Sequence, residues 1–178
     1  MKKATLATLF LCLAATAASA QTTNQGAVME QAPARTVLGD AEFVRRAVIA
    51  NRFEIEEAQL ALAQGSDPRL KEFARTMVMD HGVALKDLET ASRMAGVTLP
   101  DRKFDEPHQA KINALSRKKG ADFDQQYRAD QRQAHDDAIA LLVAYQQSGK
   151  SEQLRAWAIK ALPVVRKHRE TIGALNAP

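Results

Sequence analysis

The chain has 178 residues, of which 25 are basic and 21 acidic, with four histidines and a single cysteine. One cysteine excludes a disulfide framework, and the small excess of positive charge is weak grounds for a nucleic-acid partner. Aromatic residues make up only 5% of the chain, and the dominant residues are those that lose little on entering a helix. The composition therefore predicts an all-α protein.

The first twenty residues, MKKATLATLFLCLAATAASA, have the pattern of a secretory signal peptide. Two lysines precede an apolar run of about 15 residues, which is shorter than the roughly 20 residues that span a bilayer as a helix. Small side chains at 18–20 form a cleavage site, so we expect cleavage before Gln21 and a periplasmic or secreted protein. Bulky residues precede Cys12, which argues against a lipid anchor.

After cleavage the chain has no cysteine and, without Lys2 and Lys3, 23 basic and 21 acidic residues, a net charge of +2. The fold must then be held by its core alone. Residues 21–39 lack apolar periodicity and are rich in polar and small residues, which predicts a flexible segment before one domain at 40–176. No further apolar stretch is long enough to cross a membrane, so we expect a soluble domain without a transmembrane segment.

Helix signals begin at Asp40, which is the expected cap of a helix that runs to about residue 64. Asp67 and Pro68 begin the next helix, because aspartate is a favoured N-cap and proline's missing N–H costs nothing at the first helical position. That helix is expected to end at Gly96. The two helices are separated by a very short turn, so they predict an antiparallel hairpin.

The second half repeats this arrangement after a long connection. A short helix is expected at 107–118, a long one at 122–148, and a last one from the cap Ser151 to about residue 175, with a bend at Pro163 inside it. Two tight hairpins joined by a connection of about 25 residues predict a four-helix bundle with one long crossover that contains a short helix. This topology is ferritin-like.

Each long helix places one ionisable side chain inside or beside its apolar stripe, at about 100° per residue. The four are Glu54, His81, His135 and His168. Glu56 is expected to face solvent and Glu57 to lie at the edge of the stripe. Counted from the hairpin turns, the two inward residues of each hairpin are offset in height by roughly 5 to 7 Å, and all four lie near the middle of the bundle.

Three imidazoles and a carboxylate form a ligand set suited to one divalent zinc, copper or iron ion. Asp80 and Asp124 are the predicted acceptors behind the rings, which would fix the imidazole tautomers. No Glu-x-x-His motif occurs, which argues against a di-iron centre. The alternative is a polar layer without metal, in which Glu54 pairs with His81 and Asp124 with His135.

From residue 43 to 175 the sequence resembles the bacterial exported family known as domain of unknown function 4142, in the ferritin-like superfamily. The resemblance is carried by an ordered set of short motifs: Glu54-Ile55-Glu56, Leu60-Ala61, Phe73-Ala74, Met77-Val78, Asp80-His81, Leu99-Pro100, Gly120-x-x-Phe123-Asp124-x-x-Tyr127, His135, Leu162-Pro163 and His168. It implies a ferritin-like bundle in the cell envelope. The family has no established reaction that the resemblance could transfer.

Three functions are compatible with these features. The first is a non-enzymatic periplasmic protein that binds a metal ion and has a role in stress. The second is a structural or protein-interaction module of the envelope, in which the inward polar residues fix the helix register. A metal-dependent oxidase or peroxidase is the third, although the sequence has no two-metal motif and no catalytic residue can be assigned.

Overall fold

Local capping signals account for the helices of the computed structural model, which describes residues 38–101 and 103–175. This part of the chain contains five helices and no strand. The helices are α1 (Asp40–Gln64), α2 (Pro68–Met94), α3 (Glu106–Leu115), α4 (Gly120–Ser148) and α5 (Glu152–Ala174). Asp67 and Ser151 cap α2 and α5 as predicted, each accepting a backbone N–H of the first turn. The predicted signal peptide, and the flexible segment up to residue 37, lie outside the described residues.

Asp40 differs from the prediction. It is the first residue of α1, and Gly39 occupies the N-cap position without a side-chain hydrogen bond. The carboxylate of Asp40 instead accepts hydrogen bonds from the hydroxyl of Tyr145 at 2.7 Å and the backbone N–H of Lys150 at 3.2 Å. These bonds tie the start of α1 to the end of α4, so the aspartate joins two elements rather than capping one.

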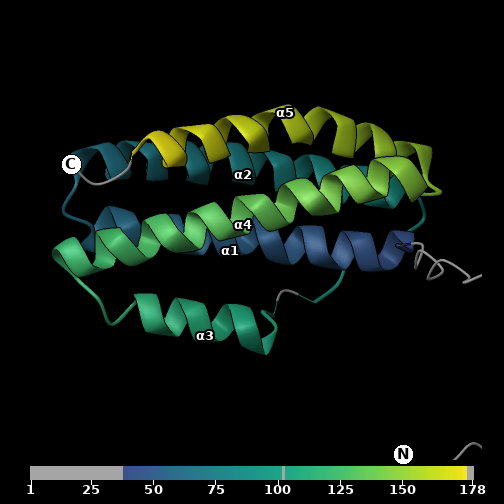
Figure 1. The fold of residues 1–178 in the computed structure, drawn as a ribbon. Helices are drawn as coiled ribbons and strands as arrows, with labels where there is room; N and C mark the ends of the chain where they lie inside the picture. Colours follow the sequence, from purple (N-terminus) through teal and green to yellow (C-terminus); the bar gives the residue numbers. More distant parts are fainter. Residues whose placement is uncertain (1–37, 102, 176–178) are drawn as a thin grey trace, which may run out of the picture. The chain divides into compact units, whose positions relative to one another are not determined.

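The helices form the predicted four-helix bundle with a long crossover (Figure 1). α1 packs against α2 and α4, and α5 packs against the same two helices. Each neighbouring pair is antiparallel, because α1 and α5 run in one direction and α2 and α4 in the other. The crossover carries the chain back along the bundle before α4 begins, and its helix α3 lies against α1 and α4. Pro163 lies within α5 and is exposed, as its position outside the apolar stripe predicts.

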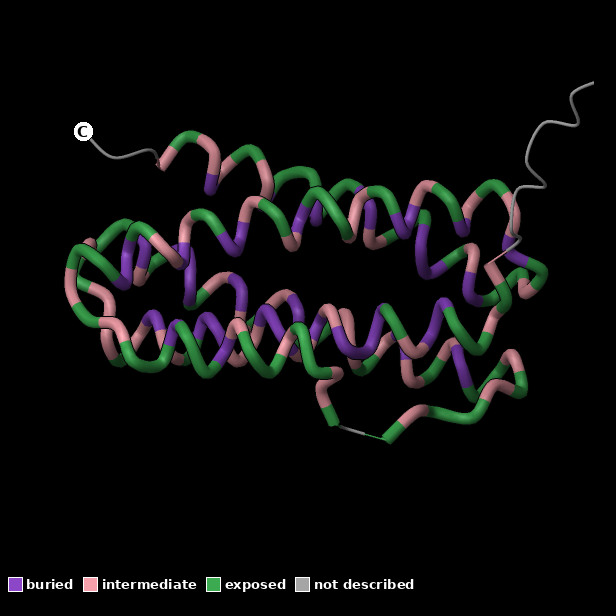
Figure 2. The backbone as a smooth tube through the Cα atoms, turned by 60° about the horizontal axis from the view of Figure 1, so that its bottom comes forward, coloured by how far each residue is buried: buried purple, intermediate pink, exposed green. Residues whose placement is uncertain are grey.

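Buried residues recur along the long helices on the sides that face one another (Figure 2), and the apolar ones form two clusters. The larger cluster joins the starts of α1 and α5 to the end of α4. There the rings of Phe43 and Tyr145 stack with their centres 3.7 Å apart, and the ring of Trp157 lies edge-on to that of Phe43. The other contains the end of α1 and the start of α2, with Phe73 and Met77. On each of the four long helices, buried polar residues lie in sequence between the two clusters, and only Ser92 and Asp124 of the buried polar residues described lie elsewhere.

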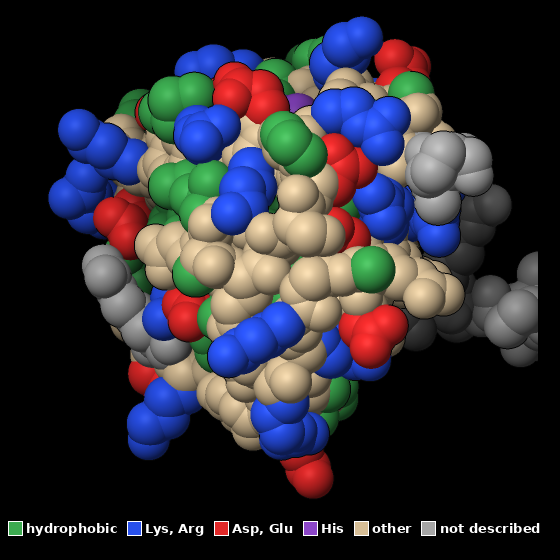
Figure 3. Space-filling model, turned by 90° about the vertical axis from the view of Figure 1, so that its left-hand side faces the viewer, with side chains coloured by type: hydrophobic (Ala, Val, Ile, Leu, Met, Phe, Trp, Pro, Cys, Tyr) green, Lys and Arg blue, Asp and Glu red, His purple; other side chains and the backbone are tan. Residues whose placement is uncertain are grey.

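One end of the bundle has a surface of mixed charge. On the end of the bundle drawn in Figure 3, Lys and Arg side chains are interspersed with Asp and Glu, so no continuous field of one sign covers this face. A mixed surface of this kind gives no electrostatic footprint for nucleic acid. Within the described residues, none of the helices has the length and apolar character needed to cross a membrane.

Candidate metal centre

The structure brings together all four inward residues that the sequence singled out. Glu54 from α1, His81 from α2, His135 from α4 and His168 from α5 are each exposed by 4% or less. The centres of the three imidazole rings are 5.4 to 5.9 Å apart, and both histidines 81 and 135 approach the carboxylate of Glu54. One residue from each long helix thus meets in the middle of the bundle.

The tautomer of His81 follows from its neighbours. Its Nδ1 lies 2.9 Å from Oε2 of Glu54 and 3.0 Å from Oδ1 of Asn51. The amide of Asn51 is oriented by its own donation to the carbonyl of Ala47 at 2.8 Å, so it presents an acceptor to the ring. Because both neighbours accept, Nδ1 carries the proton, and Nε2 of His81 is left with its lone pair.

The same reasoning fixes the other two rings. Nδ1 of His135 lies 2.7 Å from the backbone carbonyl of Gln131, which can only accept. Nε2 of His168 lies 2.8 Å from Oδ2 of Asp80, one of the two aspartates predicted to act behind the rings. The lone pairs are therefore on Nε2 of His135 and Nδ1 of His168.

Those three lone-pair nitrogens are buried and have no hydrogen-bond partner. One ring nitrogen from each histidine lies within 4.8 Å of those of the other two. Buried polar atoms without a partner are costly, so three of them on adjoining rings need an explanation. Neutral imidazole nitrogens whose opposite N–H groups are held by acceptors are the arrangement typical of metal-binding histidines.

The electrostatics keep the acid ionised. Burial alone would raise the pKa of Glu54, but the positive charge that His81 and His135, and then His168, carry when protonated, together with the hydrogen bond from His81, lowers the pKa to about 2. Glu54 is therefore a carboxylate. Burial lowers the pKa of His168 by more than its hydrogen bond to Asp80 raises it, which favours the neutral, lone-pair-bearing ring.

Four buried polar residues close to the cluster were not predicted. Asn51 holds the ring of His81, although its position in the stripe with Ala47 and Glu54 could have revealed it. Glu57, expected at the edge of the stripe, is instead fully buried, because α3 covers the seam between α1 and α4. It accepts a hydrogen bond from Gln131 at 3.1 Å. Asp130, also buried, lies 4.0 Å from Lys111 of α3.

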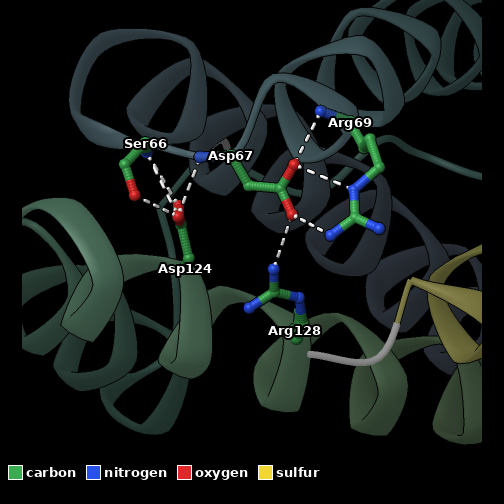
Figure 4. A network of polar contacts seen from close by, with 5 residues as sticks. All are labelled: Ser66, Asp67, Arg69, Asp124 and Arg128. Carbon is green, nitrogen blue, oxygen red and sulfur yellow. Dashed lines mark hydrogen bonds and ion pairs between the residues drawn. The ribbon is translucent and has the colours of Figure 1, made fainter. Parts of the chain in front are cut away.

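Asp124 does not join the histidines. It lies eleven residues before His135 on the same helix, roughly 16 Å along the axis. Its carboxylate accepts the backbone N–H groups of Ser66 and Asp67, both at 2.9 Å, and the hydroxyl of Ser66 (Figure 4). None of these hydrogen bonds joins Asp124 to His135, the partner predicted for it. A carboxylate on α4 instead holds the turn between α1 and α2.

Fold and site together define a class of protein: a four-helix bundle with a long crossover and a buried cluster of three histidines. The chain belongs to the family described as Domain of unknown function (DUF4142), which matches residues 15–175. This confirms the family that the ordered motifs indicated. No curated protein sequence matches the chain.

Solved structures with a similar fold include metal-bound proteins. "CopM in the Cu(II)-bound form" is 16% identical, with a TM-score of 0.64 over 76% of this chain and 94% of that chain. "CopM in the Ag-bound form (by co-crystallization)" is also 16% identical, with a TM-score of 0.62, and the match covers 76% of this chain and 93% of that chain. A DUF305 fragment from Deinococcus radiodurans is 14% identical, with a TM-score of 0.66 over 76% and 93%. At these identities the similarity establishes the fold.

Proposed function

We propose that this protein is an exported, non-enzymatic metal-binding protein whose three buried histidines hold one transition-metal ion. The observation that carries the proposal is a buried cluster of three histidines, each of which has one ring nitrogen without a partner: Nε2 of His81, Nε2 of His135 and Nδ1 of His168. Each opposite N–H meets an acceptor, so the rings are already in the tautomer that a metal ion requires.

Glu54 and Asp80 supply the negative charge of the centre. The sequence prediction that Glu54 is a fourth ligand stays a prediction, and the contact of its Oε2 with Nδ1 of His81 favours a role as an acceptor behind that ring. Two carboxylates in contact with the ligand rings balance a divalent ion, while Glu54 alone balances a monovalent one. Both charges can therefore be accommodated without an uncompensated charge in the core.

Copper is the ion that we propose first. Imidazole binds zinc, copper and iron, so the donor set alone does not select among them. The structural neighbour CopM has been solved in Cu(II)-, Cu(I)- and Ag-bound forms, which supports an ion of the copper group for this chain. Together with the signal peptide predicted at residues 1–20, this favours a role in metal stress in the periplasm.

Native mass spectrometry of the protein that starts at Gln21 tests the proposal. Loading with copper or silver is expected to add one ion, and zinc and iron serve as comparisons. The double variant His81→Ala and His168→Ala should lose the ion. His108→Ala is the matched control, because this fourth histidine pairs with Asp105 and the ring of Phe53 and should leave binding unchanged. An unchanged affinity in the double variant would contradict the proposal.

One observation supports a second candidate, a structural or interaction module of the envelope without metal. The ion pair of Glu54 with His81 at 2.9 Å satisfies part of the polar layer by itself. On this alternative, the inward polar residues fix the register of the helices. It requires that copper and silver leave the melting temperature unchanged, whereas the metal proposal requires an increase.

A further inference from the structure

A pocket of about 230 Å³ lies beside the histidines, between the four long helices. Small side chains leave room for it. Five alanines from all four long helices line it: Ala47, Ala50, Ala84, Ala138 and Ala161. The rest of the apolar lining comes from Leu141, Leu142, Val165, Trp157, Val83 and Val164. Val83 and Val164 are exposed by 62% and 43%, so the pocket opens to solvent on their side and a small molecule can enter it.

At its inner side the pocket reaches the candidate metal centre. His81 and His168 line it, together with Asn51 and Glu54. Both histidines have a buried nitrogen without a partner, Nε2 and Nδ1 respectively. Three protein ligands leave an open position on a metal ion of this kind, as at catalytic zinc sites. Because two of the three rings line the pocket, a molecule inside it lies beside that position.

The charges of the lining are already compensated. Glu54 contacts His81, Asp80 contacts His168, and Asp87 pairs with Lys160 at 2.7 Å. These four, Glu54, Asp80, Asp87 and Lys160, are the carboxylate and lysine side chains of the lining. A charged ligand would therefore enter without a counter-charge, whereas an apolar body matches the alanine, leucine and valine wall.

We propose that this pocket binds a small uncharged molecule with an apolar body and a single nitrogen or sulfur donor atom, and that the donor binds the metal ion held by the histidines. The binding of the donor atom to the metal ion, the donor half of the proposal, rests on the proposed function. The binding of the apolar body in the pocket, the apolar half, does not. An apolar cavity of about 150 Å³ is large enough to bind benzene, so the pocket accommodates a ligand of one aromatic ring.

The apolar half is tested with benzene and metal-free protein by NMR of methyl groups. Benzene and pyridine are both expected to shift the methyl signals of Leu141, Leu142 and Val165. Ala161→Phe fills the pocket and should abolish the shifts, and Ala50→Leu provides a second filling variant. Ala140→Phe is the control, because Ala140 is exposed and outside the lining. If benzene causes no shifts in the wild type, or if the shifts persist in both filling variants while these remain folded, the proposed binding in the pocket is wrong.

Cobalt-loaded protein tests the donor half, because cobalt(II) has a visible spectrum that reports its ligands. At a pH where pyridine is unprotonated, pyridine should bind at least tenfold more tightly than benzene and change the cobalt spectrum. In metal-free protein the two should bind alike. Equal affinities in the cobalt form overturn the donor half even though metal binds. A protein that binds benzene but no metal ion instead refutes the proposed function and leaves the pocket in place.

Discussion

The chemistry of each inward histidine is decided by the acceptor behind it. A side-chain amide and a carboxylate hold His81, a backbone carbonyl holds His135, and a carboxylate holds His168. The fixed proton of each ring leaves the opposite nitrogen as a potential ligand. Acceptors of this kind are therefore expected to influence metal affinity without touching the ion.

Asp80→Ala is expected to weaken metal binding by about 10- to 100-fold, because the proton position and orientation of His168 are no longer fixed. Competition with a chelator of known affinity measures the change. Asp87→Ala is a closely matched control, since Asp80 and Asp87 are on the same helix, each has one ionic partner, and their side chains are exposed by 42% and 41%. Equal losses in the two variants would show that Asp80 has no special role.

Glu57 makes stability depend on pH. Burial, followed by repulsion from Asp130, raises the pKa of this carboxyl from 4.5 to about 8. Between these values the folded protein holds a proton that the unfolded chain has lost, so the unfolding free energy falls as pH rises from 4.5 to about 8. The whole effect is on the order of 5 kcal/mol, from about 1.4 kcal/mol for each pKa unit.

Glu57→Gln should remove this dependence, because glutamine has the same shape and does not ionise. Urea unfolding at a series of pH values is expected to show a stability gain that grows from acidic to alkaline pH relative to the wild type. Glu56→Gln changes the neighbouring, less buried residue and should leave the pH profile as it is. Parallel profiles for the wild type and Glu57→Gln would contradict the raised pKa.

At the scale of elements, the sequence predicted what is local and missed what depends on packing. Caps and prolines predicted the bounds of the helices to within a few residues, and hairpin geometry predicted that Glu54, His81, His135 and His168 meet. The burial of Glu57 could not be predicted in this way, because it depends on where the crossover places α3. The role of Asp124 was missed for the same reason, since its partners belong to a turn 57 and 58 residues earlier.

That turn between α1 and α2 is fixed from outside by α4. Asp124 accepts both of its N–H groups, and Asp67 binds Arg128 of α4 at 2.8 Å and Arg69 at 2.9 Å (Figure 4). Gly65 is required there, because a Cβ atom would approach the carbonyl of Ala61 to 2.7 Å and Asp124 to 3.1 Å. The network joins the two hairpins at one end of the bundle.

Asp124→Ala is expected to lower the unfolding free energy by about 2 to 3 kcal/mol, because hydrogen bonds to a charged group are lost and two backbone donors of the turn are left without their partner. Chemical denaturation measures the loss. Gln125→Ala, an exposed neighbour on α4, should cost much less. Metal affinity should be unchanged in Asp124→Ala, since this residue lies about 16 Å along the helix from His135. A weakened metal site would instead support the original prediction that Asp124 acts behind a histidine.

In the whole molecule, a polar layer separates two apolar clusters. Each cluster draws on several helices and contains large side chains that are fully buried, so folding does not depend on the layer between them. The layer instead contains ionised and unpartnered groups, which are a cost in a dry interior. A bound ion would use those groups without changing the rest of the core.

Metal binding should therefore raise the stability of a protein that is already folded without metal. An ion present at 100 times its dissociation constant adds about 2.7 kcal/mol, because it binds the folded state alone. For a domain of this size that corresponds to a rise of roughly 5 to 10 °C in melting temperature. Differential scanning calorimetry with and without copper or silver measures it. The double variant His81→Ala and His168→Ala should melt cooperatively and show no rise, whereas a wild type that unfolds when chelated would mean that the two apolar clusters cannot hold the bundle by themselves.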